Sequence, residues 1–245
     1  MGTNQPTEKN KLTRRLLKES FTLKETQCTI ISDRSQGIEV ARNSIRRSRQ
    51  ELENFIEANP KFLYTLKPYP PPVQPPVAKM MAQAAQTAGV GPMAAVAGAV
   101  ADLAVGEMKR VGCEVAVVED GGEISAASNV PVDVAVAAGD EPLSRRFGFR
   151  LTDFPIGVAT SSGRFSHALS FGDAEAATVF CRNAALADAV ATAVGNVVRG
   201  VNADVGIKEG IKRGMGIEGV EGVLIIYLGK VGMAGKIPEI IKVDA

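Results

Sequence analysis

The chain has 245 residues, enough to bury a sizeable core, and its 28 Lys and Arg nearly balance its 27 Asp and Glu, for a formal net charge of +1. This balance gives no electrostatic support for nucleic acid or an anionic membrane as the partner. Aromatic residues make up 5% of the chain and Trp is absent, so stacking surfaces are scarce.

The polar residues 1–10 lack the apolar segment of a signal peptide. No uninterrupted apolar run reaches the roughly 20 residues that cross a bilayer, and Val90–Val105 is broken by glycine and Asp102. The cysteines, Cys28, Cys113 and Cys181, are odd in number and lack metal-ligand spacing. We therefore expect a cytoplasmic protein without a membrane span or a disulfide framework.

The N-terminal part is predicted to hold a strand and a helix after a flexible segment, residues 1–20. Phe21–Ser32 is dense in β-branched residues and favours a strand. Ile38–Ala58 carries its apolar residues on one stripe and favours an amphipathic helix, which Asn59-Pro60 ends. The arginines of this helix indicate a solvated face, with phosphate binding as the alternative.

Leu66–Val77 contains six prolines in twelve residues, which excludes a central strand or a helix interior. We expect an extended connector laid over the surface. The chain then divides into a strand–helix part at 21–65, this connector, and a main part at 78–245, all within one α+β domain.

The main part alternates helices and strands without a regular βαβ rhythm, which favours α+β over a doubly wound sheet. The predicted helices are Ala78–Ala88, Met93–Arg110, Asn183–Arg199 and Val201–Arg213, the last with Asn202 as its N-cap. The predicted strands are Glu114–Glu119, Glu123–Ser125, Val132–Ala137, Gly148–Leu151, Gly157–Ser161, Ser166–Leu169, Ala177–Phe180, Gly222–Leu228 and Lys236–Val243, with the last two forming a hairpin.

Three stretches could carry chemistry. Gly89–Asp102 is a glycine turn that leads into a helix of small residues, where free backbone N–H groups can bind phosphate; tight helix packing is the alternative. Glu119–Ile124 is an acidic glycine turn, in which Gly121 and Gly122 let a ligand approach the main chain, unless it is a plain hairpin turn.

The third stretch is the best candidate site. Thr160, Ser161, Ser162 and Gly163 follow a strand and can offer hydroxyl and amide donors to phosphate. Asp188 and Thr192 lie four residues apart, hence on one helical face, where their oxygens suit Mg²⁺. A buried Asp–Thr hydrogen bond explains them equally well. His167, the only histidine, is a candidate general base or a structural residue.

Together these motifs resemble the ApbE-like superfamily, whose best-known members are FAD:protein FMN transferases. The resemblance covers about residues 80–200 and rests on Gly98…Asp102, Asp120–Ile124, Gly157–Gly163, His167 and Ala185–Ala193. The whole chain is similar to a largely archaeal branch of soluble proteins in that superfamily, with Phe21–Ser32, Asn43–Arg46 and the proline connector as the matching N-terminal pattern.

This resemblance implies a fold of mixed sheet layers with packed helices, an FAD- or FMN-like ligand and Mg²⁺. By position, Asp188 and Thr192 match the metal-binding pair, and a backbone carbonyl near Ala95-Val96 would be a third ligand. Gly121, Gly122 and Thr160–Ser162 match pocket-lining positions, to which the small-residue turn adds Gly163. His167 matches a histidine implicated in transfer chemistry.

The chain also departs from the transferase pattern, because Ala97-Gly98-Ala99 stands where transferases carry Lys-Gly-Tyr, and Ala168–Asp173 replaces an Asp-Pro segment. Three hypotheses follow. The first is a Mg²⁺-dependent protein that binds a flavin or other nucleotide, with transferase chemistry if it is an enzyme. The second is a non-enzymatic accessory protein in the sulfur assimilation and homocysteine biosynthesis of anaerobic archaea, to which the resemblance also links this branch. The third is a homo-oligomer with a vestigial pocket.

Overall fold

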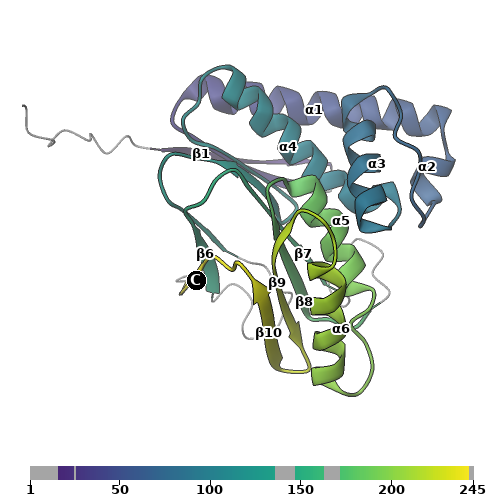
Figure 1. Ribbon diagram of the computed structural model, residues 1–245. Helices are drawn as coiled ribbons and strands as arrows, with labels where there is room; N and C mark the ends of the chain where they lie inside the picture. Colours follow the sequence, from purple (N-terminus) through teal and green to yellow (C-terminus); the bar gives the residue numbers. More distant parts are fainter. Residues whose placement is uncertain (1–15, 25, 136–146, 163–171, 243–245) are drawn as a thin grey trace, which may run out of the picture.

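The computed structural model describes residues 16–24, 26–135, 147–162 and 172–242, and every structural statement below refers to these residues. The fold is α+β, as predicted, with helices packed on an antiparallel sheet (Figure 1). The strands are β1 Leu17–Leu23, β2 Thr26–Ser32, β3 Ala116–Asp120, β4 Glu123–Ala127, β5 Val132–Ala135, β6 Phe147–Leu151, β7 Ile156–Ser161, β8 Ala176–Cys181, β9 Val220–Tyr227, β10 Lys230–Gly235 and β11 Glu239–Lys242. The helices are α1 Ser35–Ala58, α2 Lys61–Tyr64, α3 Pro76–Ala88, the 3₁₀ turn η1 Pro92–Ala95, α4 Val96–Arg110, α5 Ala184–Gly195 and α6 Ala203–Met215.

Eight strands form the main sheet in the order β1-β2-β3-β4-β7-β8-β9-β10, and a second sheet has the order β11-β6-β5. The helices cover one face of the main sheet, and residues of the small sheet pack on the other. Alternation along β9 shows how both faces are filled, since Val223 and Ile225 belong to the helix-side core while Leu224 and Ile226 face the small sheet. This period of two is what a strand buried on both faces requires.

The boundaries predicted for the N-terminal strand are wrong. Phe21–Ser32 was expected to be one strand, but β1 and β2 form a hairpin that reverses at Lys24, whose φ is +53°. A positive φ at lysine has no signal in the sequence, because the residues that favour it are Gly, Asn and Asp. β1 begins at Leu17, inside the segment expected to be flexible.

The predicted hairpin partner of β9 is also wrong. Lys230–Gly235 pairs with β9 after a turn at Leu228 and Gly229, which both have positive φ. The predicted strand Lys236–Val243 contains β11, which instead pairs with β6 in the small sheet. The tight turn lets the chain reverse at once, so the nearer segment takes the place beside β9. The predicted strand Ser166–Leu169 lies outside the described residues.

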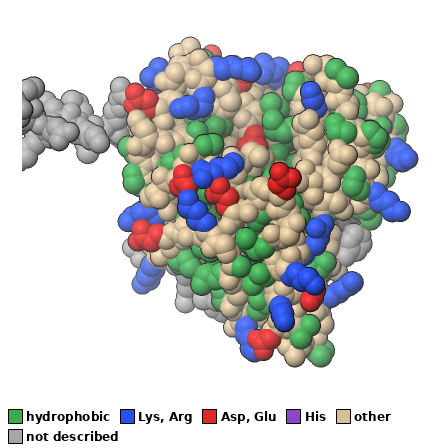
Figure 2. Space-filling view, viewed as in Figure 1, with side chains coloured by type: hydrophobic (Ala, Val, Ile, Leu, Met, Phe, Trp, Pro, Cys, Tyr) green, Lys and Arg blue, Asp and Glu red, His purple; other side chains and the backbone are tan. Residues whose placement is uncertain are grey.

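The proline-rich connector has no helix or strand from Thr65 to Pro75, and α3 begins at Pro76, where proline suits the first helical position. Among the helices that the structure describes, none is by itself long and apolar enough to cross a membrane. The segments Pro76–Ala88 and Pro92–Arg110 meet the length and composition criteria only as a pair, bent by 104°. On the face seen in Figure 2, basic and acidic side chains both occur among apolar ones.

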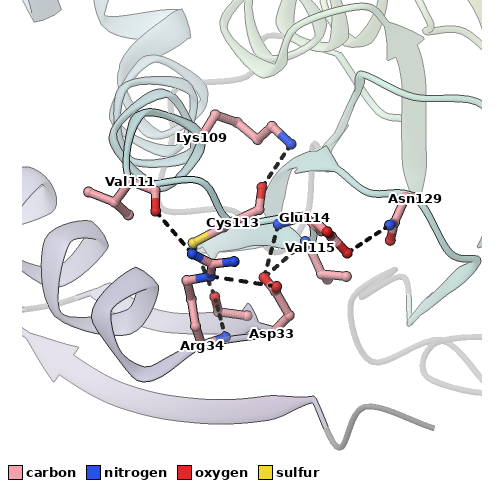
Figure 3. Close-up of polar contacts among 9 residues, drawn as sticks. Asp33, Arg34, Lys109, Val111, Cys113, Glu114, Val115 and Asn129 are labelled. Carbon is pink, nitrogen blue, oxygen red and sulfur yellow. Dashed lines mark hydrogen bonds and ion pairs between the residues drawn. The ribbon is translucent and has the colours of Figure 1, made fainter. Parts of the chain in front are cut away.

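The exit of α4 is anchored to the turn between β2 and α1 (Figure 3). The Asp33 carboxylate accepts hydrogen bonds from the backbone N–H groups of Glu114 and Val115, each at 3.1 Å. The Arg34 guanidinium donates to the carbonyl of Val111 at 3.3 Å. These contacts fix α4 against the N-terminal strands, and so fix the helix whose N-terminus contributes to the candidate site.

Candidate functional site

The N-terminal halves of α4 and α5 lie side by side and cap each other. Asp188 of α5 accepts a hydrogen bond from the backbone N–H of Gly98, near the start of α4, at 3.0 Å. Asp102 of α4 accepts bonds from the N–H groups of Ala184 and Ala185, the first residues of α5, at 2.9 Å each. The first N–H groups of a helix have no partners within that helix, so each aspartate caps the N-terminus of the other helix.

This arrangement requires the close approach that small residues permit. A Cβ atom added at Gly98 would lie 2.3 Å from the carbonyl oxygen of Ala184. A Cβ atom at Gly157 in β7 would lie 2.3 Å from the backbone nitrogen of the same residue. Gly98 and Gly157 therefore let α4, α5 and β7 come together at one point.

Two further carboxylates come to this point from the turn between β3 and β4. Asp120 ends β3 and is buried, and Glu123 begins β4. Burial raises the pKa of Glu123 well above its usual range, and the nearby carboxylates of Asp188 and Asp120 raise it further. Like charges in one partly buried place favour binding of a proton or a cation.

Asp188 has the same electrostatic character. Burial raises the pKa of Asp188 to about 7, against the opposing effect of the Gly98 N–H bond, and the charges of Asp120 and Asp102 add to the rise. Thr192 is one turn further along α5, and both side chains are partly exposed. The pair therefore shares a helical face, as predicted.

The donor set can be compared with what a metal ion needs. Within the described ranges, no group of three or more His, Cys, Asp or Glu side chains is arranged to hold a metal ion. An all-side-chain cage is therefore not present there. A carboxylate and a hydroxyl fit Mg²⁺, because this ion usually keeps several waters and phosphate oxygens as its other ligands. Ala95-Val96, the position expected to give a carbonyl ligand, lies at the break between η1 and α4.

The end of β7 supplies small polar groups. The Thr160 hydroxyl lies 2.9 Å from that of Thr178, its partner across β7 and β8. Ser161 and Ser162 are buried, and the Ser162 hydroxyl has no hydrogen-bond partner in the described part of the chain. A buried hydroxyl without a partner is a group that a ligand can satisfy. The predicted site residues Gly163 and His167 lie outside the described residues.

The predicted glycine turn is placed where a ligand could reach it. Gly121 and Gly122 have φ values of +69° and +110°, which glycine adopts without strain. A Cβ atom at Gly122 would meet nothing within 4 Å, so the turn is open on that side. The N–H of Gly121 donates to the carbonyl of Gln27, which holds the turn against β2.

The site contains residues that were not among the predicted site residues, namely Asp102, Asp120 and Glu123. The acidic turn was visible in the sequence, but its meeting with Asp188 depends on strand register and helix packing. Cys28 was also unexpected here, and its thiol donates to the Asp120 carboxylate at 3.3 Å. Burial, together with Asp120, raises the pKa of this thiol to about 12, so the thiol is not activated as a nucleophile.

Comparison with known proteins finds relatives that match most of this chain. A family model described as "AbpE bacteria" matches residues 13–210. A UPF0280 protein of Methanosarcina acetivorans is 39% identical over 245 residues, covering 98% of this chain and 96% of the relative. Another, from Methanosphaerula palustris, is 40% identical over 228 residues, covering 92% and 94%.

Solved structures show the same fold at low identity. The flavinyl transferase ApbE of Pseudomonas stutzeri, in its apo form, aligns with a TM-score of 0.58 at 13% identity, covering 90% of this chain and 94% of that one. The ApbE protein of Thermotoga maritima aligns with a TM-score of 0.55 at 12% identity, covering 90% and 97%. The chain therefore belongs to the ApbE-like family, in the archaeal branch formed by its UPF0280 relatives.

Proposed function

We propose that this chain binds a flavin nucleotide, or a related nucleotide with a diphosphate group, together with Mg²⁺ at Asp188 and Thr192. The observation that carries the proposal is the partly buried carboxylate of Asp188 at the start of α4, with the carboxylates of Asp120 and Glu123 nearby. Burial raises the pKa of Asp188 to about 7, and the charge of Asp120 adds to the rise. A divalent cation would relieve this repulsion, and Thr192 adds a second hard oxygen on the same face of α5.

The groups around this pair suit a phosphate bound to the same ion. The start of α4 directs backbone N–H groups toward Asp188, and the positive end of the helix dipole favours a negative charge there. The partnerless Ser162 hydroxyl at the end of β7 can donate to a phosphate oxygen. The fold shared with flavinyl transferases supports the choice of a flavin over other nucleotides.

Transfer chemistry is a separate step of the proposal. In a transfer reaction the pyrophosphate of FAD would break, FMN would pass to an acceptor hydroxyl and AMP would leave. By resemblance, His167 would take the proton of that hydroxyl, and Mg²⁺ would stabilise charge on the phosphate oxygens. The small residues at Ala97 and Ala99, in place of the Lys and Tyr of transferases, predict that this step is slower than in those enzymes.

Flavin binding is tested by titrating FAD, FMN and ADP into the purified chain by calorimetry, with Mg²⁺ or with a chelator. Asp188→Asn keeps an acceptor oxygen for the Gly98 N–H and removes the charge, so we expect about tenfold weaker binding of FAD with Mg²⁺. Asp204→Asn is the matched control, because Asp204 is an exposed residue of α6 that pairs with Lys230. The absence of FAD binding to the unaltered chain, or equal affinities for both variants, would refute the proposal.

One geometric observation favours a second candidate, in which Asp188 serves only to cap α4. In that case Asp188→Asn binds FAD like the unaltered chain. Asp188→Ala then lowers the free energy of unfolding and leaves FAD affinity unchanged. The hypothesis of an accessory protein in sulfur assimilation receives no support from the thiols, since Cys28, Cys113 and Cys181 are all buried. Release of AMP from FAD, together with FMN bonded to an acceptor hydroxyl, measured by chromatography and lost in His167→Ala, tests the transfer step.

A further inference from the structure

A groove of about 730 Å³ lies beside the Asp188 site, between α3, α4, β4 and the start of α5. Its volume is in the range of pockets that bind small molecules. Neither Asp188, Thr192 nor the end of β7 lines it. The three helices that surround it meet in the upper part of Figure 1. Asp102 lines it and also caps α5, so the groove adjoins the proposed nucleotide site without including its proposed metal ligands.

Gly106 in α4 lines this groove without a packing reason to be glycine. A Cβ atom added there would meet nothing within 4 Å, whereas at Gly98 it would clash with α5. Its φ is not in the left-handed region either. Glycine inside a helix costs roughly 0.5–1 kcal/mol relative to alanine. The cost is explained if another molecule lies against the backbone of α4 at this point.

The residues of α4 that line the groove form one stripe. Asp102, Val105, Gly106 and Lys109 are spaced i, i+3, i+4 and i+7, so they face the same side over about 10 Å. Asp102 at the inner end already accepts three hydrogen bonds, from Ser125 at 2.7 Å and from the two N–H groups of α5. Its carboxylate is therefore satisfied and does not call for a cation.

The middle of the groove is apolar and its outer end carries donors. Met80, Val105 and Leu186 are apolar side chains of the helix-side core that form the apolar wall. The Lys109 amine donates one hydrogen bond, to the Cys113 carbonyl at 2.8 Å (Figure 3), and has no ion pair among the described residues. The Asn183 side-chain oxygen accepts from Leu186, which leaves its NH₂ group as a donor.

The remaining cation of the lining is already neutralised. Arg182 pairs with Asp153 and with Glu221. Lys109 is thus the positive charge of the groove that is left for a ligand. An apolar wall next to one available ammonium group and an amide donor is complementary to a molecule with an apolar body and an anionic group at one end.

We propose that this groove binds a small organic anion, with an apolar ring system against Val105 and Gly106 and a carboxylate or sulfonate at Lys109. None of the residues proposed to bind the nucleotide or Mg²⁺ lines this groove, so the two proposals can fail separately. A suitable probe is 8-anilinonaphthalene-1-sulfonate, which has an aromatic body, one sulfonate and a fluorescence that rises in apolar surroundings. The uncharged N-phenyl-1-naphthylamine reports the apolar contribution alone.

The decisive variant is Gly106→Leu, which fills the groove and also improves helix propensity. We expect it to raise the thermal midpoint of unfolding by roughly 2 °C, while it weakens binding of the sulfonate probe about tenfold. Lys208→Leu is the matched control, since it places a leucine on an exposed position of α6. A thermal midpoint at or above that of the parent would exclude unfolding as the cause of lost binding.

The charge is tested by Lys109→Gln against the control Lys208→Gln. We expect Lys109→Gln to weaken the sulfonate probe about fivefold and to leave the uncharged probe unchanged. FAD affinity should stay the same in all these variants. The inference is overturned if the unaltered chain binds neither probe, if Gly106→Leu binds the sulfonate probe as tightly as Lys208→Leu does, or if Lys109→Gln and Lys208→Gln behave alike.

Discussion

Asp102 is the residue on which the stability of the helix pair depends most directly. Replacing it with alanine removes three accepted hydrogen bonds, from Ser125 and from the backbone N–H groups of Ala184 and Ala185. A buried hydrogen bond contributes about 0.5–1.5 kcal/mol net, and loss of an N-cap costs about 1 kcal/mol. Water from the adjoining groove can reach some of the freed donors, so we expect a total loss of roughly 3 kcal/mol in the free energy of unfolding.

The change can be measured by urea unfolding followed by far-UV circular dichroism. For a chain of this size, the expected loss corresponds to a fall of about 6–12 °C in the thermal midpoint, with an unchanged urea m-value. Asp133→Ala is the control, since Asp133 is exposed and its pairing with Arg150 should contribute less than about 1 kcal/mol. If Asp102→Ala costs no more than this control, mutual capping of α4 and α5 does not stabilise the fold.

Three further predictions follow from the same site. Burial raises the pKa of Asp188 from its usual value near 4 to about 7, so its contribution to stability is present below pH 4 and is lost as the pH rises through 7. Asp188→Asn should therefore flatten the fall in metal-free stability between about pH 4 and 7, and an equal fall in both proteins would contradict this. Gly98→Ala should lower the free energy of unfolding by about 1–3 kcal/mol, because its Cβ meets the Ala184 carbonyl. Gly106→Ala should raise the free energy of unfolding by about 0.5–1 kcal/mol, because its Cβ meets nothing. Urea unfolding of both variants distinguishes a glycine required by packing from one that is not. The three buried thiols should resist a thiol-specific reagent in the native protein and react in urea, and fast native labelling would contradict their burial.

Local signals in the sequence were sufficient for most elements and for part of the site. Asn202 was predicted to cap a helix, and its side-chain oxygen accepts from the N–H groups of Asp204 and Val205. The spacing of Asp188 and Thr192 placed them on one face because both lie within a single helix. Such predictions succeed because capping and helical periodicity depend on a few neighbouring residues.

The missed features depend on contacts between distant segments. Asp120 and Glu123 meet Asp188 only because β3, β4 and β7 pair in one register and α5 packs across them. Nothing near Asp102 in the sequence indicates that its partners are 82 and 83 residues away. Register and helix packing are set by the whole core, so the sequence indicated an acidic turn and a polar helix face without showing that they form one site.

The geometry of Asp188 allows a structural role and a binding role in the same side chain. A carboxylate has about four lone-pair directions, so bonds from α4 amides leave room for a further partner. Burial and the negative charges of Asp120 and Asp102 disfavour the ionised form of Asp188. These charges do not strengthen a hydrogen bond that caps a helix. A cap needs only an acceptor, and asparagine supplies one. The proposed cation uses the charge of Asp188, whereas capping uses only its acceptor oxygen. Asp188→Asn separates the two roles because it keeps the cap and removes the charge.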